Sequence, residues 1–128
     1  MLVVGGAANN VNANIAIKWP TTILAQGISY DSSTGLAVAP RVGWYSVSVQ
    51  TQGAITAGNY IYCSVNGATS ASTSNPITVW FHVTNLPATG SCLVYIGTAG
   101  HTISFRPSAN QSAGGASTDV VSIVWLGE

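Results

Sequence analysis

Two cysteines and two histidines are the side chains of this sequence that could act as nucleophiles, bases or metal ligands: Cys63, Cys92, His82 and His101. A catalytic thiol needs a base beside it and a third group that orients the base. Neither cysteine has a neighbouring histidine, and no Gly-x-Ser-x-Gly segment occurs. Zinc motifs usually place two ligands roughly two to five residues apart, whereas the nearest pair here is Cys92 and His101. We therefore predict no catalytic residue, no metal and no cofactor, and a protein that is not an enzyme.

The two cysteines are better explained as packed side chains. Cys63 lies in the run Tyr-Ile-Tyr-Cys-Ser-Val and Cys92 in the run Cys-Leu-Val-Tyr-Ile, both of which are typical of strands. Two cysteines are too few for the disulfide framework of a small secreted domain, and a free cysteine behaves as a small apolar core residue. The sequence favours two buried thiols, with a bridge between them as the alternative.

Charged residues make up 5% of the chain and its formal net charge is zero, against about 25% charged residues in an average soluble domain. They are Lys18, Asp31, Arg41, Arg106, Asp119 and Glu128. Three scattered cations cannot neutralise a run of phosphates or attract anionic lipid. We therefore expect neither nucleic acid nor a membrane as a partner. The apolar amino terminus lacks the basic flank of a signal peptide, so no leader or anchor is expected.

The spacing of apolar residues predicts strands instead of helices. No window keeps apolar residues at i, i+3, i+4 and i+7, and Gly or Pro interrupts the chain often. Short β-branched and aromatic runs alternate with polar turns, at residues 15–19, 23–25, 36–39, 44–51, 59–65, 77–83, 92–96, 102–105 and 120–126. Eight or nine short strands in 128 residues predict a single all-β domain built as an antiparallel sandwich or barrel.

The strand at residues 44–51 has one apolar and one polar face. Tyr45, Val47 and Val49 share one side, and the serines between them share the other. We therefore predict that Tyr45, Val47 and Val49 are core residues. The polar side is expected to meet water or a polar interface.

The last strand, residues 120–126, differs because only Ser122 in it is polar. A strand that is apolar on both faces is covered on both. In a two-layer sandwich the second cover must come from outside, and a symmetric copy of the same chain is the simplest source. The residues predicted to meet that copy are Val120, Val124 and Leu126.

Two tryptophans are predicted to join this outer contact. Trp44 begins its strand on the face opposite to Tyr45, and Trp80 precedes Phe81, so that those two rings point to opposite faces. Tryptophan is prominent among the side chains that anchor interfaces. We predict that Trp44 and Trp80 contact another subunit or a lattice partner. Because flat rings stack on sugars, a glycan contact at Trp44 is the alternative.

Residues 30–49 read YDSSTGLAVAPRVGWYSVSV, with an aromatic-acid pair at Tyr30 and Asp31, a turn, and a Gly-x-Tyr-x-apolar-x-apolar strand from Gly43. This segment resembles the signature of the tumour-necrosis-factor and complement C1q superfamily of trimeric jelly rolls. Residues 95–114 resemble the later strand, tight turn, strand and Gln-Ser-Gly loop of its viral members. The resemblance implies a ten-strand-like, two-sheet antiparallel jelly-roll sandwich that forms a homotrimer through one sheet.

The resemblance covers residues 27–126. Residues 1–26 are therefore expected to be an N-terminal arm or first strands before a jelly roll at residues 27–128, within one domain.

Val65-Asn66-Gly67 resembles the turn after the next long strand. Gly100-His101-Thr102 replaces the Gly-Asp-Thr turn of many members, and three carboxylates are too few to carry over the calcium sites of some relatives.

Members of the superfamily include cytokines, complement heads, bacterial surface proteins and virion proteins, so the fold does not decide the function. The scarcity of charge and the compact length favour a virion location on the capsid surface. We expect a trimeric capsid decoration, or cement, protein of a phage or other virus, whose partners are copies of itself and the major capsid protein. The alternatives are the receptor- or glycan-binding tip of a viral fibre and a secreted lectin or C1q-like module.

Overall fold

The computed structural model describes residues 1–6, 12–51, 60–67, 78–80, 88–109 and 119–128. These residues contain ten strands and no helix. The strands are β1 (Leu2–Gly5), β2 (Thr21–Ala25), β3 (Ser29–Asp31), β4 (Leu36–Val38), β5 (Gly43–Thr51), β6 (Tyr60–Val65), β7 (Thr78–Trp80), β8 (Ala88–Ile96), β9 (Thr102–Pro107) and β10 (Val120–Gly127).

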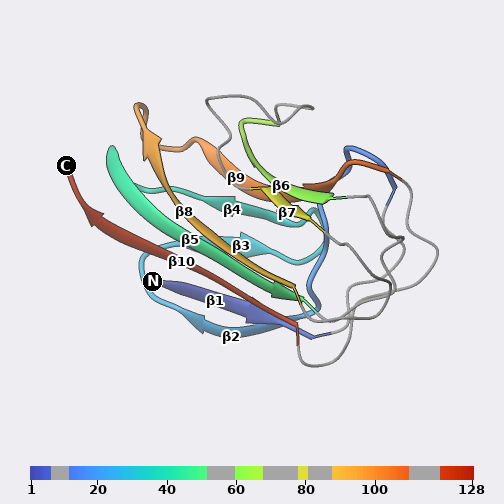
Figure 1. Ribbon diagram of the computed structural model, residues 1–128. Coiled ribbons are helices and arrows are strands. Elements are labelled where there is room, and N and C mark those ends of the chain that lie inside the picture. Colours follow the sequence, from blue (N-terminus) through green and yellow to red (C-terminus); the bar gives the residue numbers. More distant parts are fainter. Residues whose placement is uncertain (7–11, 52–59, 68–77, 81–87, 110–118) are drawn as a thin grey trace.

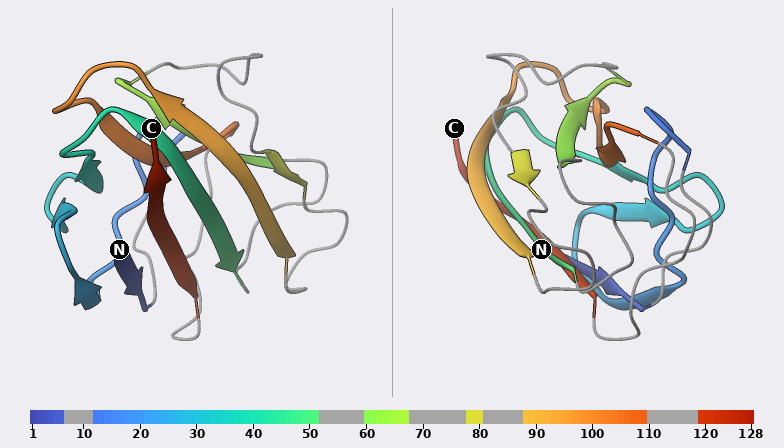
Figure 2. Two further views of the ribbon diagram at one scale, coloured as in Figure 1. Left: turned by 90° about the vertical axis from the view of Figure 1, so that its left-hand side faces the viewer. Right: turned by 45° about the vertical axis from the view of Figure 1, so that its right-hand side comes forward.

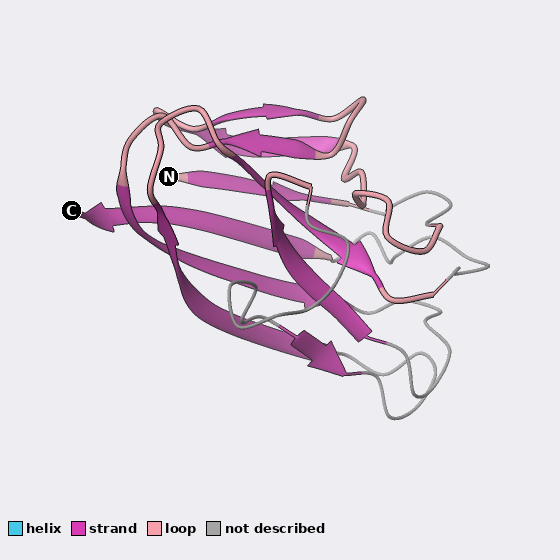
Figure 3. Cartoon of the chain, turned by 90° about the horizontal axis from the view of Figure 1, so that it is seen from above, coloured by secondary structure: helices cyan, strands magenta, loops and turns pink. Residues whose placement is uncertain are grey.

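The strands form two five-stranded antiparallel sheets (Figure 1). The first sheet has the order β2-β1-β10-β5-β8 and the second has the order β3-β4-β9-β6-β7. The view from above shows the strands of both sheets together with the described loops (Figure 3). In the first sheet β8, β5 and β10 run side by side as one broad layer (Figure 2). The predicted two-sheet antiparallel sandwich is confirmed, with jelly-roll strand order.

The core lies between the sheets and follows from strand alternation. Tyr45, Val47 and Val49 of β5 are 0% exposed. Ile103 and Phe105 of β9 enter the same cluster from the second sheet. Fully burying side chains of this size stabilises the fold by about 1.5–3 kcal/mol each. The core therefore fixes which face of β5 points away from the second sheet.

The described residues at the start of the chain, 1–6 and 12–26, belong to this sandwich. Strand β1 lies inside the first sheet, paired with β2 on one side and β10 on the other. Leu2 and Val4 are each 1% exposed and belong to the core cluster. The amino group of Met1 donates to the Gln26 carbonyl oxygen at 2.7 Å, which fixes the start of the chain beside the end of β2.

The segment at residues 15–19 is not a strand, and that prediction was wrong. Asn14 has a φ of 62°, which turns the chain at the start of the segment. The Asn14 N–H donates to the Pro107 carbonyl at 2.9 Å and the Ile17 N–H to the Phe105 carbonyl at 2.8 Å. Between these two hydrogen bonds the chain moves on by three residues, from Asn14 to Ile17, while β9 moves by two, from Pro107 to Phe105. A regular antiparallel ladder has equal numbers on both strands. Trp19 is nevertheless buried, with its ring 5.9 Å from that of Phe105.

The turn between β3 and β4 explains part of the residue 30–49 pattern. The Asp31 carboxylate accepts hydrogen bonds from the Ser33 N–H at 2.8 Å and the Ser33 hydroxyl at 2.6 Å. These bonds lower the pKa of the exposed Asp31 carboxyl. Gly35 has a φ of 76°, and a Cβ there would collide with the Ile17 carbonyl oxygen. The acid and the glycine therefore shape a turn.

Candidate functional site

The two cysteines are unsuited to nucleophilic chemistry. Cys63 is fully buried in β6 of the second sheet, and Cys92 is half-buried in β8 of the first; both are free thiols. Burial raises the pKa of the Cys63 thiol to about 12 and that of the Cys92 thiol to about 11. Because the thiolate is the reactive form, both side chains are held in the less reactive thiol form near neutral pH. They pack as apolar residues at the core.

The histidines and carboxylates do not assemble a metal site in the part of the chain that the structure describes. His101 lies in the turn between β8 and β9, and His82 falls outside the described residues. No group of three or more His, Cys, Asp or Glu side chains among the described residues could hold a metal ion. In the same residues, no helix has the length and apolar character needed to cross a membrane.

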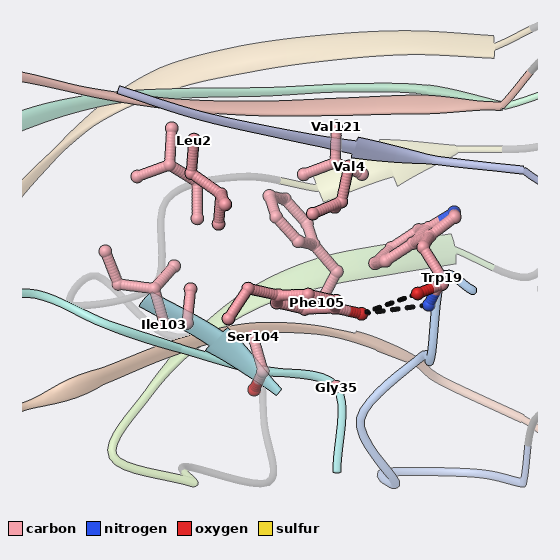
Figure 4. Close-up of a pocket in the computed structure, with 11 residues that line it drawn as sticks. Leu2, Val4, Trp19, Gly35, Ile103, Ser104, Phe105 and Val121 are labelled. Atoms are coloured by element: carbon pink, nitrogen blue, oxygen red, sulfur yellow. Dashed lines mark hydrogen bonds between the residues drawn. The ribbon is translucent and has the colours of Figure 1, made fainter. Parts of the chain in front are cut away.

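A small cavity between the sheets is lined by core residues that include Leu2, Val4, Trp19 and Phe105 (Figure 4). Its volume is about 10 Å³, which is close to the lower limit for one water molecule. The Tyr30 hydroxyl, also at this cavity, bonds to the backbone N–H and carbonyl of Trp19 at 2.9 and 3.3 Å. The cavity is a small packing gap and is too small to hold a ligand.

The outer face of the first sheet is the strongest candidate surface. Opposite the core side of β5 lie Trp44, Ser46, Ser48 and Gln50. Strand β5 lies between β10 and β8 and pairs with both over nearly its whole length. Register therefore places the outward residues of three long strands side by side.

One end of this face is apolar. Trp44 pairs with Tyr95 of β8, and Ser46 lies between Leu93 of β8 and Val124 of β10. The Trp44 and Tyr95 rings meet edge to face, with their centroids 5.2 Å apart. Exposed fractions are 45% for Trp44, 53% for Leu93, 52% for Tyr95 and 57% for Leu126. We call Trp44, Leu93, Tyr95, Val124 and Leu126 the apolar end.

The other end carries hydroxyl and amide groups. Ser48 lies between Ser91 of β8 and Ser122 of β10, and the next outward pair is Gln50 and Thr89. The hydroxyls of Ser48 and Ser122 are hydrogen-bonded at 2.7 Å. We call Ser48, Gln50, Thr89, Ser91 and Ser122 the hydroxyl end. Hydroxyls both donate and accept hydrogen bonds, so two copies of such a surface can satisfy one another.

A register shift in β10 helps to shape the apolar end. Trp125 pairs with Tyr45, but Gly127 pairs with Trp44, so Leu126 is an extra residue in the strand. Such a bulge redirects side chains locally. The backbones approach closely here, since a Cβ on Gly43 would collide with the Gly127 carbonyl oxygen. The bulge therefore holds Leu126 at the end of the strand, where 57% of it is exposed.

Inward contacts hold this bulge in place. The Trp125 indole N–H donates to the Val42 carbonyl at 3.2 Å. The Arg41 guanidinium carbon lies 4.8 Å from the centre of the Trp125 ring, within the range of a cation–π contact. The Tyr45 hydroxyl donates to the Arg41 carbonyl at 2.8 Å and accepts from the Arg41 N–H at 3.2 Å. The segment before β5 and the end of β10 are thus tied together beneath the apolar end.

The structure places three of the five predicted contact residues, Trp44, Val124 and Leu126, in the apolar end. Val120 pairs with Gln50 at the opposite end of the face. Trp80 is in β7, but its side chain and all of Phe81 lie outside the described residues. Sequence reasoning did not single out Leu93 and Tyr95. The alternation of Cys92, Val94 and Ile96 with Leu93 and Tyr95 was the pattern that could have identified them.

Strands β5, β8 and β10 contain no Asp, Glu, Lys, Arg or His. The face built from them is therefore uncharged along its whole length. The cores of protein interfaces are depleted in charge and enriched in aromatic residues. This face combines both properties with exposed Trp and Tyr rings.

Solved structures show which class of fold this is. The chain matches the crystal structure of murine APRIL at pH 8.0 with a TM-score of 0.70 and 11% identity, covering 98% of this chain and 97% of that chain. It matches the globular domain of zebrafish complement 1qA protein with a TM-score of 0.67 and 9% identity, covering 99% and 97%. No protein-family model and no curated protein matches the sequence.

The chain therefore has the TNF/C1q-like jelly-roll fold, as the residue 30–49 segment implied. The likeness in structure extends over nearly the whole chain, beyond the residues 27–126 that carry the sequence resemblance. Strands β1 and β2 belong to the first sheet, and β1 supplies Leu2 and Val4 to the core between the two sheets.

Proposed function

We propose that this protein is a non-enzymatic structural protein that forms a homotrimer through the outer face of its first sheet and decorates a viral capsid. The observation that carries the proposal is the uncharged outer face of β5, β8 and β10, with Trp44, Leu93, Tyr95 and Leu126 about half exposed at one end. Exposed apolar clusters of this kind mark interaction sites.

A second copy of the chain is the occupant that fits this face best. A charged partner surface would lose water there without gaining an opposite charge. A copy brings apolar side chains to the apolar end and hydroxyls to the hydroxyl end. The threefold symmetry of the assembly comes from the superfamily resemblance of residues 30–49.

The capsid assignment rests on the composition of the rest of the molecule. Net charge is zero and charged residues make up only 5% of the chain, so binding would depend on many weak contacts and not on electrostatic steering. Three identical subunits that meet a symmetric lattice site would multiply such contacts. The partner on this proposal is the major capsid protein.

Particles that lack the protein test this function. They should assemble, lose integrity at a lower temperature than complete particles, and regain resistance when purified protein is added back. Added protein should saturate at a fixed ratio to shell subunits. Particles equally stable with and without the protein, or added protein that does not bind them, would exclude a cement role.

A glycan- or receptor-binding head is the second candidate, either as a viral fibre tip or as a secreted C1q-like module. The exposed edge-to-face pair of Trp44 and Tyr95 favours it, because aromatic rings can stack on sugar faces. A glycan array probed with the protein separates the two candidates. Selective binding that Trp44→Ala abolishes, together with no binding to capsids, would establish the second function in place of the first.

A further inference from the structure

The turn that follows β6 contains the single Asn-Gly pair of the chain, Asn66 and Gly67. Asn66 is exposed, and both residues have positive φ angles, 50° for Asn66 and 76° for Gly67. A glycine after asparagine leaves its backbone nitrogen without the steric cover of a Cβ. The exposed Asn66 side-chain amide therefore lies next to a half-buried backbone nitrogen that no Cβ covers.

Two neighbours favour attack of that nitrogen on that amide. The Thr102 N–H donates a hydrogen bond of 2.9 Å to Asn66 Oδ1. A donor in this position polarises the carbonyl and stabilises negative charge that develops on its oxygen. The Asn66 N–H donates in turn to the Thr102 carbonyl at 2.9 Å, which holds Asn66 beside the start of β9.

The second neighbour is the Arg106 guanidinium, which lies beside Gly67: a Cβ on Gly67 would be 3.5 Å from Arg106 Nη2. Arg106 is anchored by its bonds to the Asn14 carbonyl at 2.6 Å and to the Ser104 hydroxyl at 3.2 Å. A nearby positive charge favours the anionic form of a titrating group. It therefore favours the deprotonated Gly67 nitrogen that attacks.

From this geometry we infer that Asn66 is a self-modification site that deamidates through a cyclic imide. The Gly67 nitrogen gives its proton to hydroxide or water and forms a bond to Asn66 Cγ. The side-chain nitrogen takes up a proton and leaves as ammonia. Water then opens the imide at one of its two carbonyls and leaves either aspartate or isoaspartate at position 66.

The modification changes the charge of the molecule. Its formal net charge is zero, and each conversion adds one carboxylate close to the Arg106 guanidinium. The aspartate product retains an oxygen that can accept from the Thr102 N–H. The isoaspartate product adds a backbone atom to the turn and shifts that oxygen.

The purified, folded protein should be kept in mildly alkaline buffer, sampled over time, digested and analysed by mass spectrometry. Enzymatic methylation of isoaspartate would identify the second product. We expect conversion at Asn66, with Asn12 and Asn14 in the same digests unchanged because Ala13 and Ile15 follow them. Conversion at Asn66 no faster than at Asn14 would overturn the inference.

Variants test the role of the fold. Arg106→Gln should slow conversion by about threefold to tenfold, as expected if the cation lowers the pKa of the attacking nitrogen by up to roughly one unit. Arg106→Lys should restore most of the rate, and Arg41→Gln, which removes the same charge elsewhere, should not change it. Thermal melting would verify that each variant is folded. Faster conversion in urea than in the folded protein would show that the turn protects Asn66 and would refute the proposed assistance.

Discussion

Among single residues, Tyr45 links the core to the segment that leads into β5. Its ring is 0% exposed, and its hydroxyl bonds to the backbone of Arg41 on the segment that leads into β5. We expect Tyr45→Ala to lower the free energy of unfolding by about 3–5 kcal/mol, as for large aromatic truncations. Tyr45→Phe removes both hydrogen bonds of the hydroxyl and should cost about 1–3 kcal/mol, at about 0.5–1.5 kcal/mol for each bond. Chemical denaturation measures both.

Ser46→Ala is the matched control on the opposite face of the same strand, and it should change stability by less than about 0.5 kcal/mol. A larger effect at Ser46 than at Tyr45 would mean that the two faces are assigned the wrong way round. Ser48 differs from Ser46 because its hydroxyl bonds to Ser122. Alternation predicted the outward direction of Ser48, but its partner is 74 residues away in sequence, so no local pattern could show the bond.

The buried thiol of Cys63 predicts a loss of stability at alkaline pH. Burial raises the pKa of this thiol from 9.0 to about 12, so the folded chain binds the thiol proton more tightly than the unfolded chain does. Its contribution to stability is complete below pH 9 and is lost as the pH rises toward 12. The free energy of unfolding should fall by up to about 1.4 kcal/mol per pH unit in that range.

Denaturation curves at a series of alkaline pH values test this expectation, with Cys63→Ala as the comparison. Cys92, Tyr30 and Tyr62 also contribute to the raw profile, because burial raises the pKa of each of these groups and acts in the same direction. The difference between the parent protein and Cys63→Ala isolates the thiol. Parallel pH profiles for the two proteins would contradict a buried, protonated Cys63.

Elements with strong alternation could be predicted from the sequence, and short ones could not. The run at residues 44–51 corresponds to β5, and the run at residues 120–126 falls within β10. Strand β3, three residues long with two of them exposed, has no apolar face to detect. Strand β1 is four residues long and apolar throughout, so it shows no alternation, and the sequence left residues 1–26 as either an arm or first strands. Strand β1 is made by pairing with β2 and with the distant β10, and β3 is made by pairing with β4 across the turn at Gly35.

Part of the apolar end was predictable for the same reason. Parity along β5 and β10 placed Trp44 and Leu126 away from the core. The sequence did not show that Tyr95 would meet Trp44, because the register of β5 against β8 is set by long-range pairing. The bulge at Leu126 also depends on a tertiary contact, the close approach of Gly43 and Gly127.

The contact of Gly43 with the end of β10 gives a prediction at the scale of the element. Gly43 and Gly127 have nearly equal φ angles, 130° and 135°, but only a Cβ on Gly43 would meet another atom. Both alanine variants should carry a backbone penalty of about 1–3 kcal/mol. Gly43→Ala should cost clearly more, because its methyl group collides with the Gly127 carbonyl. Equal losses in urea denaturation would argue against the close approach of the two strands.

At the scale of the molecule, the proposed self-association would cover the uncharged face of a chain that has few charges elsewhere. Self-association would remove the half-exposed rings of Trp44 and Tyr95 from water and leave loops and the second sheet as the outer surface. An assembly held by apolar and hydroxyl contacts depends little on ionic strength, since salt screens only charges. The same property would suit a protein that adds to a preformed shell through many weak contacts.

Light scattering tests the assembly directly. At micromolar concentration the protein should have about three times the 13.1 kDa mass of the chain, in low and high salt alike. Leu93→Asp places a charge in the apolar end and should yield a folded monomer, because a carboxylate buried there would have no cation within reach. Ile15→Asp is the matched control. Ile15 is 54% exposed and Leu93 is 53% exposed, but Ile15 lies on the segment that runs alongside β9 in the second sheet. The Ile15→Asp protein should remain trimeric, so dissociation of both variants, or of neither, would remove the apolar end as the site of self-association.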